Sequence, residues 1–262
     1  MKSVFFCFVK VRTAERGLLL LVKKADLRIW KTLTLDGMNT RPKMRSTMTI
    51  EEYLEIKEIA KHLTEKIFSW GKGKFDYLAS GKELELISNG SFVFDGDSDT
   101  DNLQDYMMYN SRQKGLRVLD SFYDSEIELD DTEELILEGM VNSEMSIFEI
   151  YEIDSDSNKC RIYLKGLLKS GKYEVVNLGF SQTALTGMII CARMIELEDG
   201  LYMTSGATFA FDSVSKDRLL ADYSFEKFKN RKNLNSDDLF LFCNKKSKTY
   251  GKRVKHLDYD EN

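Results

Sequence analysis

The sequence predicts an α+β protein with a helical N-terminal half and a small, strongly bent antiparallel sheet or barrel in the C-terminal half, with flanking helices. The main observation is a change of period: apolar residues recur with helical spacing in residues 49–70 and 129–145, and they alternate with period two after residue 145. Length and composition agree, because 262 residues with 42% hydrophobic side chains can bury a core without metal or disulfide support.

Residues 1–47 differ from the remainder, because they are basic, contain few acids and have no sustained period. We expect them to form a basic extension, and we expect the folded domain to begin at Met48. Three alternatives remain open for this extension: a disordered arm, a folded arm, or an overlong start of translation.

Residues 48–142 are expected to be mainly helical. Thr49 and Glu52 form the sequence of a capping box at the start of a helix over residues 49–70. Its apolar residues follow 3-4-3-4 spacing, which predicts one buried stripe: Tyr53, Ile56, Ala60, Leu63, Ile67 and Trp70. A short strand pair around Asn89-Gly90 and a helix over residues 129–145 follow.

Residues 143–212 are expected to form a β-rich module of five short strands. A strand, turn and strand occupy residues 146–165, and three further strands cover residues 173–180, 187–197 and 200–212, the last broken near Gly206. The final region, residues 213–262, contains an amphipathic segment around residues 214–230, a short apolar run at residues 238–243 and a basic tail.

The stretch "GLLKSGKY" at residues 166–173 is one residue away from the phosphate-binding pattern G-x-x-x-x-G-K-[ST]. Tyr173 stands where a short hydroxyl must hold magnesium, and the residues after it favour a strand where the pattern requires a helix. We therefore interpret this stretch as a loop between two strands. We predict no nucleotide site there, and no cofactor or metal elsewhere.

Residues of about 119–211 resemble a β-rich domain of uncharacterised bacterial and archaeal proteins, some of which also carry a zinc-binding SEC-C motif. The matching stretches are "SIFEIYEI", "KGLLKSGK", Ser181 and "TGMIICARMI", the last of which includes Arg193. Lys165 and Met188 depart from the pattern, and the SEC-C cysteines are absent. The resemblance therefore implies the β-rich fold and a loop at "GLLKSGKY", without a zinc ion or an assigned reaction.

The cysteines and the N-terminus indicate a cytoplasmic protein. Cys7, Cys160, Cys191 and Cys243 are scattered without a C-x-x-C pair, which is typical of thiols in a reducing compartment. The apolar run at the N-terminus stops at Lys10, and no run approaches the roughly 20 apolar residues that cross a bilayer. We expect no membrane association.

An acidic run at residues 95–101 has the alternation of a calcium-binding loop. Thr100 and Tyr106 stand where that loop needs Gly and Glu, so a solvated acidic loop is the preferred interpretation. A metal-dependent hydrolase that uses acids from residues 95–105 with Glu58 or His62 is kept as an alternative.

The scarcity of histidine and the lack of catalytic spacing favour a non-enzymatic binding or scaffolding protein, with a protein partner or a homo-oligomer as the expected assembly. Nucleic-acid binding through the basic ends is the alternative. The candidate phosphate contacts are Lys246, Lys248, Lys252 and Arg253. Arg193 is the candidate functional residue of the sheet, as a side chain that emerges from a strand.

Overall fold

The structure is a computed structural model that describes residues 7–9, 20–22, 48–154, 160–198 and 200–252. The chain divides into two compact units, Met1–Lys43 and Met44–Asn262, which we treat separately. In the first unit, β1 (Cys7–Val9) and β2 (Leu20–Val22) form an antiparallel pair. The remainder of the expected basic extension, and Arg253, lie outside the described residues.

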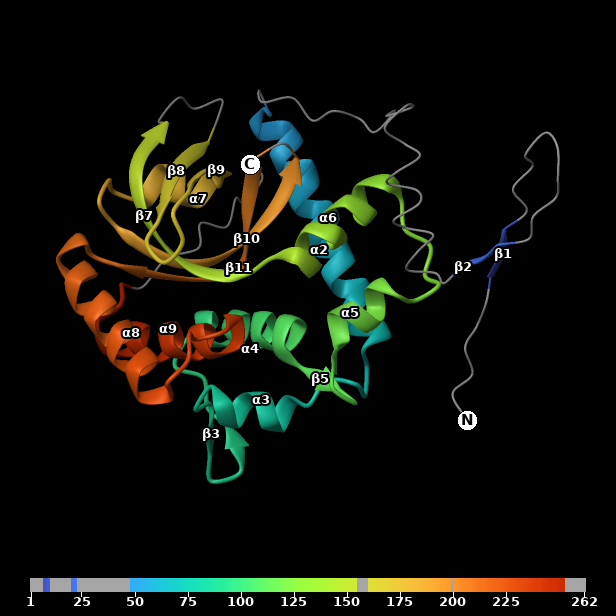
Figure 1. Cartoon of the computed structure of the whole chain (residues 1–262), viewed down its shortest axis with the longest axis horizontal. Coiled ribbons are helices and arrows are strands. Elements are labelled where there is room, and N and C mark those ends of the chain that lie inside the picture. Colours follow the sequence, from blue (N-terminus) through green and yellow to red (C-terminus); the bar gives the residue numbers. More distant parts are fainter. Residues whose placement is uncertain (1–6, 10–19, 23–47, 155–159, 199, 253–262) are drawn as a thin grey trace. The chain divides into compact units, whose positions relative to one another are not determined.

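The second unit contains a closed five-stranded barrel (Figure 1). Its strands are β7 (Met145–Asp154), β8 (Arg161–Gly166), β9 (Lys172–Val176), β10 (Ile189–Glu198) and β11 (Leu201–Phe211). Around the barrel the order is β10, β11, β9, β8, β7. The predicted α+β fold with a C-terminal barrel is confirmed.

One strand pairing of the barrel is parallel, where the sequence predicted an antiparallel sheet. Leu201 pairs with Glu174 and Tyr202 with Val175, and these pairs join β11 to β9 in the same direction. The other four pairings are antiparallel. The mixed order arises because the chain passes through α7 and β10 before β11 returns beside β9.

The helix α7 (Leu178–Thr183) corrects the expected strand over residues 173–180. The strand ends at Val176, and the side chain of Asn177 accepts a hydrogen bond of 2.8 Å from the backbone of Phe180. Phe180 and Ala184 then pack into the barrel interior with Ile150, Ile162 and Leu164. The β-forming residues before Asn177 concealed this short helix from sequence reasoning.

Helices cover the outer face of the barrel along β10, β11 and part of β7. Alternate residues of β10 divide between the two sides: Ile190 and Ala192 face the interior, whereas Cys191 and Ile195 pack in the cluster shared with the helices. Eight helices lie in the described ranges, and the remaining seven are α2 (Ile50–Trp70), α3 (Tyr77–Glu83), α4 (Asp97–Asn110), α5 (Val118–Tyr123), α6 (Asp131–Asn142), α8 (Lys216–Asn230) and α9 (Ser236–Tyr250).

Two short hairpins connect the helices, β3 (Ile87–Ser88) with β4 (Ser91–Phe92) and β5 (Arg112–Gln113) with β6 (Leu116–Arg117). A single 3-10 turn, η2 (Ser213–Ser215), leads from β11 into α8. The predicted strand pair around Asn89-Gly90 is confirmed by the β3–β4 pairing.

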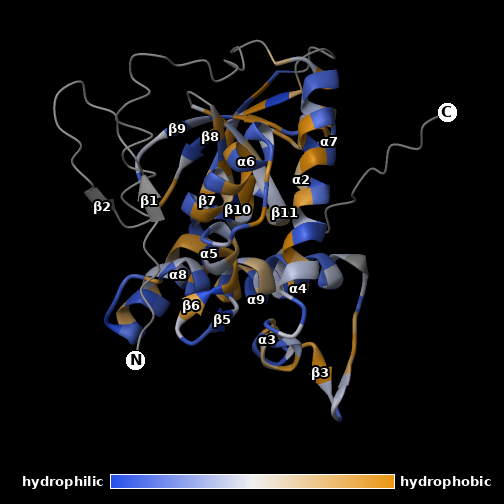
Figure 2. Cartoon of the chain, turned by 90° about the vertical axis from the view of Figure 1, so that its right-hand side faces the viewer, coloured by the Kyte–Doolittle hydropathy of each residue, from blue (hydrophilic) through white to orange (hydrophobic). Residues whose placement is uncertain are grey.

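The helix α2 follows its sequence pattern closely. Thr49 and Glu52 make both hydrogen bonds of the capping box, and Tyr53, Ile56, Leu63 and Ile67 are buried. Figure 2 shows apolar and polar residues alternating along this helix. Its amphipathic pattern therefore predicts both its boundaries and its buried face.

A close contact between α6 and β10 requires a glycine. A Cβ atom built on Gly139 of α6 would lie 2.4 Å from the carbonyl oxygen of Glu196 on β10. The absence of a side chain lets α6 approach the backbone of the barrel directly.

The loop "GLLKSGKY" connects two antiparallel strands, as predicted. Lys165 at the end of β8 pairs with Lys172 at the start of β9. The predicted break near Gly206 takes the form of a shift in register. Ala192 pairs with Thr208 and Met194 with Thr204, so that one residue of β10 lies opposite three residues of β11.

Candidate functional site

Arg193 is the one residue of β10 at the shift in register between Ala192 and Met194, and its side chain is buried among helices. It is 1% exposed. One terminal nitrogen, Nη1, donates to the carbonyl oxygen of Ser143 at 3.2 Å and to Ser236 Oγ at 3.1 Å. The guanidinium carbon lies 4.1 Å from the ring centroid of Tyr109. The side chain of Arg193 thus contacts neighbouring elements and not solvent, and its role as a functional residue stays a prediction.

A buried carboxylate supplies negative charge to this cluster. Asp105 of α4 accepts a hydrogen bond of 3.4 Å from the backbone N–H of Ala207. Ala207 belongs to the three residues of β11 that have no pairing partner on β10, because of the shift in register. Burial raises the pKa of Asp105, and the charge of Arg193 partly opposes that rise. Burial likewise lowers the pKa of Arg193, and Asp105 opposes that change. The two charges therefore stabilise each other across the layer between α4 and the barrel.

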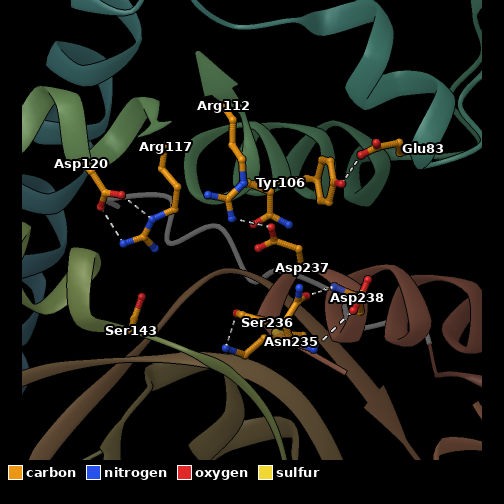
Figure 3. Close-up of polar contacts among 12 residues, drawn as sticks. Glu83, Tyr106, Arg112, Arg117, Asp120, Ser143, Asn235, Ser236, Asp237 and Asp238 are labelled. Carbon is orange, nitrogen blue, oxygen red and sulfur yellow. Dashed lines mark hydrogen bonds and ion pairs between the residues drawn. The ribbon is translucent and has the colours of Figure 1, made fainter. Parts of the chain in front are cut away.

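The same cluster fixes the start of α9. Ser236 Oγ accepts a second hydrogen bond, of 2.9 Å, from the backbone N–H of Met145 on β7. Asn235 caps the helix in a capping box with Asp238, and Arg112 from β5 pairs with Asp237 at 2.9 Å (Figure 3). The loop between α8 and α9 is thus held at its C-terminal end by contacts from three other elements.

The helix α8, which precedes this loop, leaves large apolar side chains uncovered. Only Leu219 is fully buried along its length. Phe225 is 64% exposed, Phe228 is 81% exposed, and Val214 in the preceding turn is 87% exposed. These residues, with Arg218 and Ala221, follow a 4-3-4-3 spacing on the side of the helix away from the core. We call these five residues the outer stripe of α8.

Unpaired cations surround the end of this stripe. An open surface hollow of about 740 Å³ is lined by Lys227, Phe228, Lys229, Arg231 and Lys232, among others. Lys232 forms an ion pair with Asp238 at 3.0 Å, whereas Lys227, Lys229 and Arg231 have no ion-pair partner in the part of the chain that the structure describes. This end of α8 therefore combines exposed aromatic surface with positive charge, which is the chemistry of a binding surface.

The family to which the chain belongs is now defined by comparison with known proteins. Residues 47–256 match the model of a family described as "Family of unknown function (DUF7986)". The chain belongs to this family. No curated protein and no solved structure is significantly similar to it. The match confirms membership of an uncharacterised family, and the SEC-C connection stays a prediction.

The predicted phosphate contacts of this family member have partners within the chain. Lys246 pairs with Asp222 of α8 at 2.7 Å, and Lys252 pairs with Asp212 at 2.6 Å. Lys248 Nζ donates to the carbonyl oxygen of Leu84 at 3.1 Å. Through Tyr250, the expected basic tail is the continuation of α9, so its lysines hold α9 against neighbouring elements; their role as phosphate contacts stays a prediction.

The acidic segment is the start of a helix, which corrects the expected solvated loop. The helix α4 begins at Asp97, and buried Asp99 accepts a hydrogen bond of 2.8 Å from the backbone N–H of Asp95. Glu58 and His62 are exposed on α2. Across the described ranges, no three His, Cys, Asp or Glu side chains come together as a metal site.

The cysteines of the barrel and α9 are buried. Cys160, Cys191 and Cys243 form no disulfide, and burial, together with the neighbouring thiol of Cys191, raises the pKa of Cys243 well above its usual value. No helix in the described parts of the chain is long and apolar enough to cross a bilayer.

Sequence reasoning missed the outer stripe of α8, although a signal for it exists. Residues 214–230 were recognised as amphipathic, but α8 carries two stripes: Leu219 and Tyr223 on the side that packs against α9, and the outer stripe on the other. The heptad-like spacing of Val214, Ala221, Phe225 and Phe228 could have identified the second stripe.

Proposed function

We propose that this protein is a non-enzymatic binding or scaffolding module that engages a protein partner through the outer stripe of α8. The observation that carries the proposal is the exposure of Phe225 and Phe228, at 64% and 81%, on one face of a regular helix. Full burial of one such side chain against a partner is worth about 1.5–3 kcal/mol. Two of them one turn apart supply a substantial part of a binding energy.

Helical spacing makes a protein partner the best fit. Apolar side chains at 4-3-4-3 intervals interlock with the side chains of a second helix. The ion pairs and hydrogen bonds that hold α9 also support α8, because Asp222 of α8 binds both Lys246 and the hydroxyl of Tyr250. A supported helix presents its outer stripe with little loss of conformational entropy on binding.

Photo-cross-linking in cells that express the chain naturally tests this proposal. The photoreactive residue p-benzoylphenylalanine replaces Phe228, and in the matched control it replaces Leu185, which is 66% exposed but lies outside α8. The proposal expects a discrete adduct from position 228 and none from position 185. Equal labelling at both positions, or no adduct at position 228, would contradict it.

Nucleic-acid binding is the second candidate, and the three unpaired cations Lys227, Lys229 and Arg231 beside Phe228 favour it. Phosphates would pair with the cations, and a base would stack on the exposed ring. Anisotropy of labelled single-stranded RNA and DNA across a salt series provides the test. Neutralising these three cations should lower the salt slope by about 2 for single strands, whereas neutralising the exposed Lys57, Lys72 and Lys82 should leave it unchanged.

The hydrolase alternative has no geometric support among the described residues, because Asp99 and Asp105 make separate structural hydrogen bonds. It stays a prediction, as does the cytoplasmic location.

A further inference from the structure

We infer that the outer side of β7, β8 and β9 binds single-stranded nucleic acid. Two tyrosines of this surface stack on bases, two lysines contact a phosphate, and one carboxylate accepts a hydrogen bond from a base. We call these five residues the barrel face: Tyr151, Glu152, Tyr163, Lys165 and Lys172. The inference goes beyond the proposed function, because the barrel face shares no residue with α8.

The barrel has the strand order of an OB-fold. With β7 counted as the first strand, the order around the barrel is first, second, third, fifth, fourth. The third and fifth strands, β9 and β11, are parallel, and α7 lies between the third and fourth strands along the chain. Barrels of this kind bind oligonucleotides or oligosaccharides on the face of their second and third strands. This likeness points to β8 and β9, and the side chains there carry the argument.

The helices of the second unit leave this side of the barrel open. They cover β10, β11 and part of β7, whereas β8 and β9 lie on the side away from α4 and α9 (Figure 1). Ile162 and Leu164 of β8 face the interior, so Tyr163 and Lys165 lie on the outer side. Lys165 and Lys172 are exposed, and Tyr163 is half-buried. These side chains are therefore accessible to a ligand.

Two tyrosine rings form an aromatic surface on the barrel face. The ring centroids of Tyr151 on β7 and Tyr163 on β8 are 6.3 Å apart, with an interplanar angle of 47°. Tyr151 is the extra residue of a β-bulge, since the residues on either side of it pair with successive residues of β8. The bulge thus supplies a second ring beside Tyr163. Partly accessible rings of this kind stack on the bases of single strands.

Two lysines without an ion pair lie beside these rings. Lys165 and Lys172 are directly opposite each other on β8 and β9, and Lys172 Nζ lies 5.2 Å from the ring centroid of Tyr151. Neither lysine has an ion-pair partner in the described ranges, because Glu149, which pairs with Lys165 across the strands, binds Lys216. Like charges at opposed positions repel each other. A phosphate bound between the two lysines removes this repulsion.

The carboxylates near the barrel face favour a nucleotide over other ligands. Glu174 on β9 forms an ion pair with buried Arg161, so its charge is compensated. Glu152 is exposed, pairs across the strands with Tyr163 and has no ion-pair partner in the described ranges. A carboxylate accepts hydrogen bonds from the amino groups of unpaired bases. A neutral oligosaccharide would leave the repulsion between the lysines in place.

Fluorescence anisotropy with the full chain and labelled oligothymidylate, oligocytidylate and oligouridylate of 12 nucleotides tests the inference across a salt series. Lys165→Gln combined with Lys172→Gln should lower the slope of log affinity against log salt by about 1.4, the value for two phosphate contacts on a single strand. Tyr163→Ala should weaken binding by about 5-fold or more, the effect of losing one stacked base.

Matched controls replace the same residue types elsewhere. Tyr77→Ala removes an exposed tyrosine of α3, and Lys57→Gln combined with Lys72→Gln removes two exposed lysines outside the barrel. Neither control should change the affinity or the salt slope. Circular dichroism verifies that all variants fold.

A second readout does not depend on the loss of an aromatic ring. Tyr163→Trp keeps a ring that can stack on a base, so it should retain binding, and its fluorescence should be quenched when oligothymidylate is added. Wild type, in which the tryptophans are Trp30 and Trp70, gives the background signal. Binding without quenching at position 163 would contradict stacking at the barrel face.

The remaining outcomes separate this inference from the functions proposed for α8. It is overturned if no oligonucleotide binds at low salt, or if substitutions in the barrel face leave binding unchanged. Binding that is lost only when Lys227, Lys229 and Arg231 are neutralised would assign the nucleic acid to α8. Binding of maltohexaose in place of the oligonucleotides would assign the barrel face to a sugar. Photo-cross-linking at Phe228 tests the protein partner independently of these results.

Discussion

The consecutive helices α8 and α9 have the same length, 15 residues, and each contains two phenylalanines, but these side chains have opposite environments. In α9, Phe240 and Phe242 are buried. In α8, Phe225 and Phe228 are exposed. The helix α9 begins in a capping box, whereas Ser215 before α8 makes no side-chain capping bond.

The difference follows from what each helix packs against. Phe240 lies between Tyr106 of α4 and Phe209 of β11, with ring centroids 5.3 and 5.2 Å away. The helix α8 buries one stripe against α9 and leaves its second stripe uncovered. An aromatic residue at helical spacing therefore predicts a contact, and only the surrounding elements decide whether that contact lies within the chain or with a partner.

The largest expected effect separates the two pairs of phenylalanines. Phe240→Ala should lower the free energy of unfolding by about 4 kcal/mol, because it leaves a cavity among buried rings. Phe228→Ala should change the free energy of unfolding of the monomer by no more than about 0.5 kcal/mol. Urea denaturation at a concentration where the chain is monomeric measures both. Similar losses in the two variants would mean that α8 is covered within the chain.

The second prediction concerns the anchor of α9. Arg193→Met should cost about 2–3 kcal/mol at neutral pH, because it leaves the buried carboxylate of Asp105 without a compensating charge. Removal of the positive charge raises the pKa of Asp105 further. When Asp105 has a higher pKa in the folded state than in the unfolded state, its protonation stabilises the folded state at low pH. This stabilisation is lost as the pH rises through the pKa of the folded state. Urea denaturation at pH 4 and pH 7 should therefore show the smaller loss at pH 4.

The matched control for this prediction is the double variant Arg193→Met with Asp105→Asn. It contains no buried carboxylate at position 105, so the double variant should have no pH-dependent loss of stability from this site between pH 4 and pH 7. If the loss of stability of the single variant relative to wild type is as large at pH 4 as at pH 7, or larger, the assignment of Asp105 is wrong.

The contact between the two helices should have a smaller effect. Asp222 of α8 accepts hydrogen bonds from Lys246 and Tyr250 of α9, and the bond from Lys246 lowers the pKa of Asp222. Asp222→Asn should cost about 0.5–1 kcal/mol near pH 7. The contribution is present above the unfolded pKa of about 3.9 and is lost as pH falls through the folded value. Wild type and variant should converge in thermal unfolding at pH 2–3.

The smallest expected effect is a gain in stability at the end of α8. Arg231 ends the helix with φ of 53°, in the left-handed region that glycine adopts more easily. Arg231→Gly should raise the free energy of unfolding by up to about 1 kcal/mol. The same variant removes one of the three unpaired cations, so it separates stability from binding: a more stable protein with weaker ligand binding is the expected result.

Elements with a local signal could be predicted from the sequence. The capping box of Thr49 and Glu52 placed the start of α2, and the alternation of residues 187–197 and 200–212 predicted β10 and β11. The basic run after residue 243 concealed α9, although Asn235 and Asp238 carry the capping-box pattern that marks its start. Charge drew attention away from helix signals in that segment.

The buried cluster could not be predicted, because its contacts join residues far apart in the sequence. Arg193 and Ser143 are separated by 50 residues, and Asp105 and Ala207 by 102. A strand arginine is usually exposed, whereas this one lies on the same side of β10 as Cys191 and Ile195, which the helices cover. The spacing of the outer stripe of α8 is visible in the sequence, but its exposure is not, because only the structure shows that the other side of α8 is the one that packs against α9.

Closure of the barrel has a consequence for how any partner can attach. An open sheet ends in strands with unpaired backbone groups, onto which another chain can add a strand. The pairing of β11 with β9, through Leu201–Glu174 and Tyr202–Val175, gives every strand of this barrel two neighbours. No strand of the barrel therefore offers a full-length free edge, and we expect recognition of a protein partner by this unit to depend mainly on side chains displayed by its helices, short hairpins and loops.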